Sequence, residues 1–168
     1  LQTRPNGKVA ILVQNDDFGK DLEKGLLDGF GDKAKAMIVG RQTYETTDPT
    51  IDSQIVQLKG TGADALILVS TPKFTAMALK KASEIGWQPA RYVSSVSQSV
   101  SAVLKPVGFD IAKGVISSSY LREVSDPAVQ ASKEYQEYAA VLKQFYPGGD
   151  PNDVFNLVGY SSAQTMVQ

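Results

Sequence analysis

The side chains with the most obvious chemistry lie in one short segment, where Asp16, Asp17 and Lys20 follow an apolar stretch. Carboxylates and a lysine at this spacing can act as acids, bases or nucleophiles in an enzyme. The same residues also suit a simpler role, because an aspartate placed before a helix accepts hydrogen bonds from the free N–H groups of its first turn. We expect capping rather than catalysis, and we predict that the chain is not an enzyme.

Two residue types, cysteine and histidine, are absent from all 168 residues. Their absence excludes disulfides, cysteine nucleophiles, zinc–thiolate sites and catalytic triads that need an imidazole. We therefore expect no metal site of that kind. The formal net charge is -1 and like charges do not form a run, so nucleic acid is not an expected partner.

Hydrophobic periodicity alternates between strand and helix along the chain. Short apolar runs predict five strands, at residues 8–14, 36–44, 65–70, 91–95 and 114–120. Helical spacing connects them, and a short helix is expected over residues 96–104. Five βα units without a hairpin signal predict an α/β fold with a doubly wound parallel sheet flanked by helices. Right-handed crossovers and a switch beside the first strand predict the strand order 2-1-3-4-5.

Proline marks several predicted helix starts, because it suits the first helical position after a capping side chain. Four pairs have this form: Asp48-Pro49, Thr71-Pro72, Asp126-Pro127 and Asp150-Pro151. The longest amphipathic stripe runs through Tyr135, Tyr138, Leu142 and Phe145 and predicts a helix, and we assign Tyr135 and Tyr138 to the core.

Ligands of a doubly wound sheet bind beyond the carboxyl ends of the strands, and no cofactor motif is found there. A dinucleotide site needs Gly-x-Gly-x-x-Gly directly after a strand, but the first strand is followed by Asn15-Asp16-Asp17-Phe18-Gly19. A phosphoryl-accepting receiver domain needs an aspartate after the third strand, where Ser70 and Thr71 stand. We predict that the chain holds no cofactor.

The segment from Asn15 to Asp21, placed between an apolar strand and a helix, resembles the start of the second lobe in one family. That family is the branched-chain amino-acid-binding (Leu/Ile/Val) group of type I periplasmic solute-binding proteins, which serve ABC transporters. The resemblance continues through residues 52–59, 62–65 and 82–87, and it ends in residues 159–164. It covers nearly the whole chain, and the order and spacing of the motifs carry it.

The resemblance implies that residues 1–150 form the second, C-terminal lobe of a two-lobed binding protein. Residues 151–168 would then be a hinge crossover and the start of a first-lobe helix, with the rest of the first lobe outside this sequence. The implied function is an extracytoplasmic solute-binding component of an ABC importer, periplasmic or lipid-anchored, whose partner is the permease in the membrane. An effector-sensing domain of a receptor or transcriptional regulator on the same fold remains the alternative.

The resemblance also implies three ligand contacts. Family members place an aromatic ring on the ligand from the loop after the first strand, which is Phe18 here, and a second contact after the third strand, which is Thr71. An acidic residue after the fourth strand pairs with the ammonium group in amino-acid binders, and Val96 stands at that position. The acidic side chain that would pair with an ammonium group is thus absent. We therefore predict a ligand without a free α-ammonium, such as an aromatic or aliphatic carboxylate.

Strand ends supply three further candidates: Ser95, Ser97 and Tyr120. Each candidate also has a structural explanation. Phe18 can pack under the following helix, Thr71 can cap the helix that begins at Pro72, and the two serines can cap the next one. Tyr120 can belong to the core or the rim of the sheet.

Overall fold

The computed structural model of the chain describes residues 7–167. The chain divides into two compact units. The first comprises the residues up to Gln98 together with Val103–Ser118, and the second comprises Ser99–Ala102 together with the residues from Ser119 onwards. The division lies at residue 118, whereas the sequence places the end of the second lobe at residue 150. Which lobe residues 119–150 belong to stays a prediction.

The first unit is built on a five-stranded sheet whose pairings are all parallel. Its order is β2-β1-β3-β4-β5, so the predicted fold class and strand order are confirmed. The strands are β1 Val9–Gln14, β2 Ile38–Tyr44, β3 Ala65–Val69, β4 Ala90–Val93 and β5 Val115–Ser117. The last strand is shorter than predicted, because it ends at Ser117 rather than at Tyr120.

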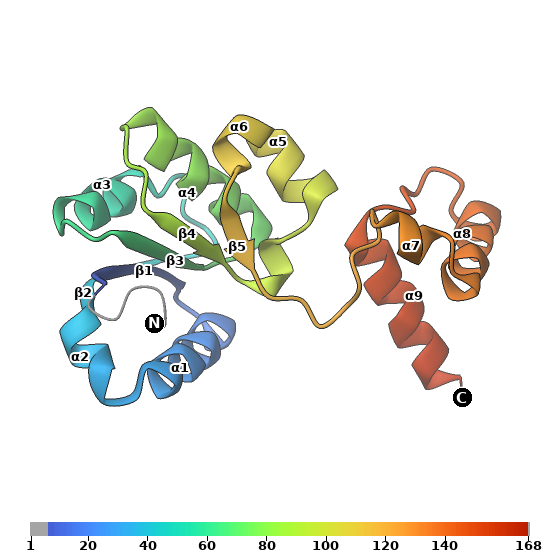
Figure 1. Cartoon of the computed structure of the whole chain (residues 1–168), viewed down its shortest axis with the longest axis horizontal. Coiled ribbons are helices and arrows are strands. Elements are labelled where there is room, and N and C mark those ends of the chain that lie inside the picture. Colours follow the sequence, from blue (N-terminus) through green and yellow to red (C-terminus); the bar gives the residue numbers. More distant parts are fainter. Residues whose placement is uncertain (1–6, 168) are drawn as a thin grey trace. The chain divides into compact units, whose positions relative to one another are not determined.

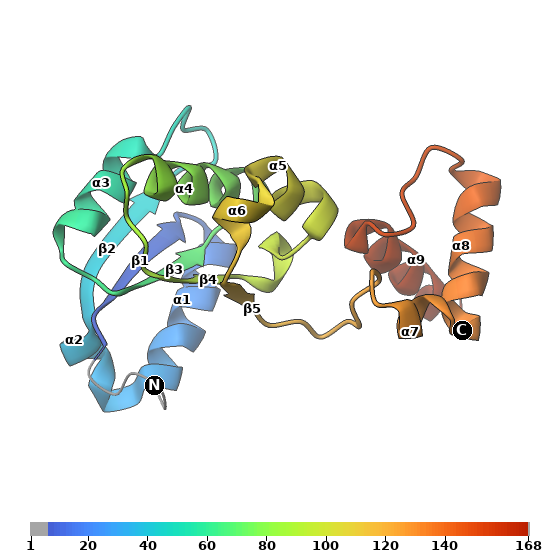
Figure 2. The same cartoon turned by 45° about the horizontal axis from the view of Figure 1, so that its top comes forward.

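Helices cover both faces of this sheet, with α1 and α2 on one face and α3, α4, α5 and α6 on the other (Figures 1 and 2). Their bounds are α1 Asp17–Phe30, α2 Ala34–Met37, α3 Asp52–Gly60, α4 Pro72–Glu84, α5 Lys105–Val107 and α6 Phe109–Ala112. The first face also carries a 3₁₀ turn at Gly31–Lys33.

The expected helix over residues 96–104 is replaced by two irregular segments. A 3₁₀ turn spans Ser95–Ser97 and a π-helical segment spans Val100–Leu104. Serine explains the difference, because its hydroxyl competes for backbone groups that would otherwise bond within a helix. Ser99 accepts the N–H of Ala102 in this way, whereas Ser97 is drawn to a group outside the segment by donating its hydroxyl to the carbonyl of Ser70.

The core of the first unit has two layers separated by the sheet. Alternate residues of β1 point to opposite faces, so Ala10 and Leu12 join the layer under α3 and α4 while Ile11 joins the layer under α1 and α2. Every residue of β1 is buried for this reason. Burial on both faces explains why the strand reads as a continuous apolar run rather than an alternating one.

The described residues of the second unit form three α-helices: α7 Pro127–Gln130, α8 Lys133–Phe145 and α9 Val154–Met166. Tyr138 is fully buried, and its ring lies 5.8 Å from that of Tyr135 and 5.4 Å from that of Tyr160, centroid to centroid. The assignment to a core is therefore confirmed for Tyr138, whereas Tyr135 is only half-buried. Among residues 7–167, no helix has the length and apolar character needed to cross a membrane.

Only one of the four proline pairs forms the predicted capped helix start. Asp126 accepts the N–H of Ala128 at 2.8 Å, with Pro127 at the first position of α7. The prediction is wrong for Asp48 and Asp150, which accept N–H groups of Glu45 and Asn152 in turns before α3 and α9 begin. Thr71 stands at the cap position of α4, but its side chain makes no capping hydrogen bond.

Candidate functional site

The carboxyl edge of the sheet in the first unit is polar, and its residues are joined by hydrogen bonds. Gln14 and Tyr44 are the last residues of β1 and β2, whereas Thr71 and Ser94 follow β3 and β4 by one or two positions. Because parallel strands end at one edge, residues 30 and 57 positions apart in the sequence meet there.

Asp16 fixes the first turn of α1, which carries Phe18. Its carboxylate accepts the N–H of Gly19 at 2.9 Å and the side-chain amide of Gln14 at 2.6 Å. These two hydrogen bonds, that of Gly19 first, hold the pKa of Asp16 below its usual value, since both favour the charged form. The predicted capping role of Asp16 is confirmed, and the half-buried Phe18 lies in the turn that Asp16 caps.

Gln14 is the centre of the network and is 4% exposed. Its Oε1 accepts the hydroxyls of Tyr44 and Thr71, each at 2.8 Å. Tyr44 also accepts the backbone N–H of Thr71 at 3.3 Å, and its ring lies 4.2 Å from that of Phe74. Burial raises the pKa of the Tyr44 phenol, so it remains a hydrogen-bond donor at neutral pH.

The serines after β4 turn inward. Ser94 and Ser97 donate their hydroxyls to the carbonyl of Ser70, at 2.9 and 2.7 Å. Ser97 is fully buried as a result, whereas Ser95 and Val96 between them stay half-buried. The predicted capping alternative for Ser95 and Ser97 is not what the structure shows, because the 3₁₀ turn has Ser94 at its start and no side-chain cap.

The structure thus brings five of the six predicted ligand residues to one unit: Phe18, Thr71, Ser95, Val96 and Ser97. Tyr120 belongs to the second unit, three residues beyond the end of β5, and is 80% exposed. Its predicted place at the end of the strand is wrong. Among residues 7–167, no cluster of acidic side chains could hold a metal ion.

Sequence reasoning missed Gln14, Tyr44 and Ser94 as members of this edge. One signal for the first two is visible in retrospect. Gln14 is a polar residue that closes an otherwise apolar strand buried on both faces, and such a side chain must find hydrogen-bond partners. Tyr44 closes the neighbouring strand in the same register position, opposite Gln14.

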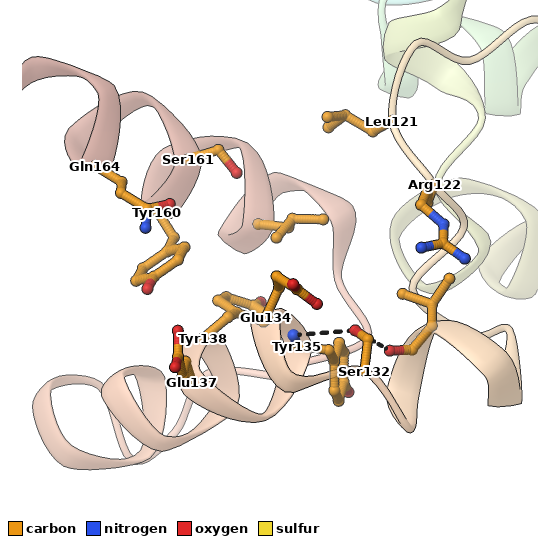
Figure 3. A pocket seen from close by; sticks show the side chains of 12 residues that line it. Leu121, Arg122, Ser132, Glu134, Tyr135, Glu137, Tyr138, Tyr160, Ser161 and Gln164 are labelled. Atoms are coloured by element: carbon orange, nitrogen blue, oxygen red, sulfur yellow. Dashed lines mark hydrogen bonds between the residues drawn. The ribbon is translucent and has the colours of Figure 1, made fainter. Parts of the chain in front are cut away.

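The second unit contains a hollow of about 380 Å³ between α8 and α9 (Figure 3). Tyr138 and Tyr160 approach each other across it, and Glu134 and Glu137 line it from α8. The Tyr138 hydroxyl is buried and has no hydrogen-bond partner among the described residues. Burial raises the pKa of this phenol to about 12. No sequence motif pointed to this hollow.

The family model described as periplasmic binding protein matches residues 1–168. The chain belongs to the periplasmic binding protein family. Among curated proteins, this periplasmic binding protein is similar to Leu/Ile/Val-binding protein homolog 7 of Brucella abortus (strain 2308), with 23% identity over 163 residues. The match covers 96% of the chain but only 40% of that relative. The predicted family resemblance is therefore confirmed.

Solved structures share the fold of this periplasmic binding protein. An extracellular ligand-binding receptor from Verminephrobacter eiseniae ef01-2 has a TM-score of 0.74 at 20% identity, over 98% of this chain and 45% of that one. A fatty acid ABC transporter substrate-binding protein from Thermomonospora curvata has a TM-score of 0.70 at 19% identity, over 93% and 39%. The named relatives are binding proteins rather than enzymes.

Proposed function

We propose that the protein is the extracytoplasmic solute-binding component of an ABC importer, located in the periplasm or anchored by lipid. One observation carries the proposal most directly. Gln14 bonds both to Asp16, which caps the turn bearing Phe18, and to Thr71 after β3. A single buried side chain therefore holds two predicted ligand-contact segments at the edge where sheets of this type bind ligands.

The proposed ligand is a small carboxylate, either amino-acid-like or an aromatic acid. Phe18 offers a ring face that suits a flat or apolar body, and the half-buried Thr71, Ser95 and Val96 add contacts at the same edge. The buried Ser97 acts through the shape of its turn, because its hydroxyl is bonded to Ser70.

Binding proteins with two lobes enclose their ligand by hinge bending, and we propose the same for this protein. The remaining contacts then come from the missing first lobe of the same protein, outside this sequence. The closed, loaded form would be recognised by the permease in the membrane. We predict that the ligand lacks a free α-ammonium, because a buried ammonium without a carboxylate partner costs several kcal/mol in free energy.

The test is calorimetry and thermal shift on the whole protein with leucine, valine and benzoate. A ligand that binds only the folded state raises its melting temperature. We expect benzoate to bind more tightly than leucine, and Phe18→Ala to weaken binding about tenfold, which corresponds to about 1.4 kcal/mol and lies within the usual range of an aromatic contact. Phe109→Ala, at a phenylalanine of α6 that is 61% exposed, is the matched control and should leave affinity unchanged.

Two results would contradict this proposal. Micromolar leucine binding without any response to benzoate would show that the ligand class is wrong. Equal affinities of the Phe18→Ala variant and the unaltered protein would show that the carboxyl edge of this sheet is not the binding site.

A further inference from the structure

Four hydroxyl protons at the carboxyl edge of the sheet are already used within the protein. A hydroxyl has one proton to donate and two lone pairs that accept. Tyr44 and Thr71 donate to Gln14, and Ser94 and Ser97 donate to the carbonyl of Ser70. The half-buried Thr71 and Ser94 therefore present lone pairs, and no proton, to anything that approaches the edge, whereas Tyr44 and Ser97 are buried.

Asp16 sets the direction of this network. Its carboxylate oxygen lies 2.6 Å from the Gln14 amide, and an ionised carboxylate can only accept. Gln14 must therefore turn its NH₂ group toward Asp16 and its carbonyl oxygen toward Tyr44 and Thr71. The opposite orientation would place a carbonyl oxygen against a carboxylate, two acceptors without a proton between them. The ionised Asp16 thus fixes, through Gln14, the direction in which the Thr71 hydroxyl donates its proton.

The charge of Asp16 is secure at neutral pH. Its pKa is lowered by the hydrogen bonds from Gly19 and Gln14 and by the nearby ammonium of Lys20. Tyr44, the other titratable group in the network, has a raised pKa because it is buried. Both groups therefore keep the protonation states that this direction requires.

We propose that Thr71 is a specificity-determining residue that accepts a hydrogen bond from a neutral O–H or N–H group of the ligand. This inference rests on the proposed binding function and narrows its ligand class. A carboxylate or carbonyl group at the same place would face the lone pairs of Thr71 without a donor, which leaves a desolvated acceptor unpaired. The carboxylate of the ligand must therefore be bound elsewhere. We take the donor to be neutral, because Ser95-Val96-Ser97 carries no anionic side chain for an ammonium group and the carboxylate of Asp16 is already bonded to Gly19 and Gln14.

The test uses ligands that differ only in donor capacity, measured by calorimetry on the whole protein. The pairs are 2-hydroxyisocaproate against 2-ketoisocaproate and 3-hydroxybenzoate against 3-methoxybenzoate. Leucine, which has the carbon skeleton of the first pair, carries an ammonium group at the same position. We expect at least one hydroxyl compound to bind about tenfold more tightly than its acceptor-only partner, the usual effect of one satisfied donor. Thr71→Val should remove most of this ratio, and Thr71→Ser should retain it.

A second variant separates hydrogen-bond direction from simple support of the loop. Asp16→Asn keeps the size of the side chain and its ability to cap α1, but its amide can donate to Gln14 and lets the network reverse. The ratio of affinities within each ligand pair should then fall to about threefold or less, because Thr71 would act as an acceptor toward the ligand in only part of the molecules. Asp17→Asn, at an exposed neighbouring carboxylate, is the control and should leave the ratio unchanged.

The outcomes are distinct. Tighter binding of hydroxyl compounds that depends on Thr71 and Asp16 supports the inference. Equal or tighter binding of the keto and methoxy compounds, or binding of leucine or benzoate with no gain from either hydroxyl compound, overturns it and leaves the binding function standing. Failure of every probe, including leucine, valine and benzoate, overturns the proposed function and this inference with it.

Discussion

Gly19 lies directly against the carbonyl group of Gln14. A Cβ atom placed on Gly19 would be 1.8 Å from the Gln14 carbonyl oxygen and 2.8 Å from its carbonyl carbon. Both atoms are backbone, so no side-chain rotation could relieve the contact. The first turn of α1 can therefore approach the end of β1 this closely only with glycine at position 19, and this close approach places Phe18 at the sheet edge.

We expect Gly19→Ala to destabilise the protein by about 3 kcal/mol, the upper end of the usual cost of overpacking. The measurement is the free energy of unfolding in urea. Gly25→Ala in the same helix is the matched control, because nothing lies within 4 Å of its Cβ position. That variant should be more stable by about 0.5 to 1 kcal/mol, since alanine loses less backbone entropy in a helix. Equal effects of the two substitutions would contradict the close approach.

Tyr44→Phe should cost about 1 to 2 kcal/mol of stability, because it removes a buried donor to Gln14 and leaves the Thr71 N–H without its acceptor. Chemical denaturation would measure the loss. Tyr92→Phe, at a half-buried tyrosine of β4, is the control and should change the unfolding free energy little. A neutral Tyr44→Phe variant would mean that the hydroxyl does not support the network.

Asp16 should make stability depend on acid pH. Its folded pKa lies below the usual value of 3.8, so the charged carboxylate stabilises the fold fully above that value. This contribution is lost as the pH falls from about 4 toward the lowered folded pKa. We expect Asp16→Asn to have a lower melting temperature than the unaltered protein at pH 7, with the difference shrinking below pH 4. A difference that persists unchanged below pH 4 would contradict the role of the Asp16 charge.

Tyr138→Phe should stabilise the protein by about 1 kcal/mol, because a buried hydroxyl without a partner keeps its desolvation cost. Burial raises the pKa of this phenol to about 12 from the usual 10, so the protein loses stability as the pH rises from 10 to 12, where only the unfolded state ionises. The variant should lack that alkaline loss, unlike Tyr146→Phe at an exposed tyrosine of the same unit. Destabilisation by Tyr138→Phe would reveal a partner outside the described residues.

The sheet and its order could be predicted because their signals are local. A strand buried on both faces must be apolar throughout, as β1 is, and strands that alternate with helices leave few right-handed arrangements. The Asp16 cap was predictable for the same reason, since the residue and its partner Gly19 are three positions apart. Prediction failed at Asp48 and Asp150, where the same residue pair forms a turn and the helix begins later.

The sequence alone determined the fold class, the strand order, the family resemblance and the segment that carries Phe18. Only the tertiary structure decided how the polar side chains at the sheet edge bond to one another. Gln14 accepts hydrogen bonds from Tyr44 and Thr71, which lie 30 and 57 positions away in the sequence. These bonds decide that both hydroxyls donate to Gln14. Periodicity reports which face of an element is buried, but the direction of a hydrogen bond depends on atoms that folding brings together from separate strands.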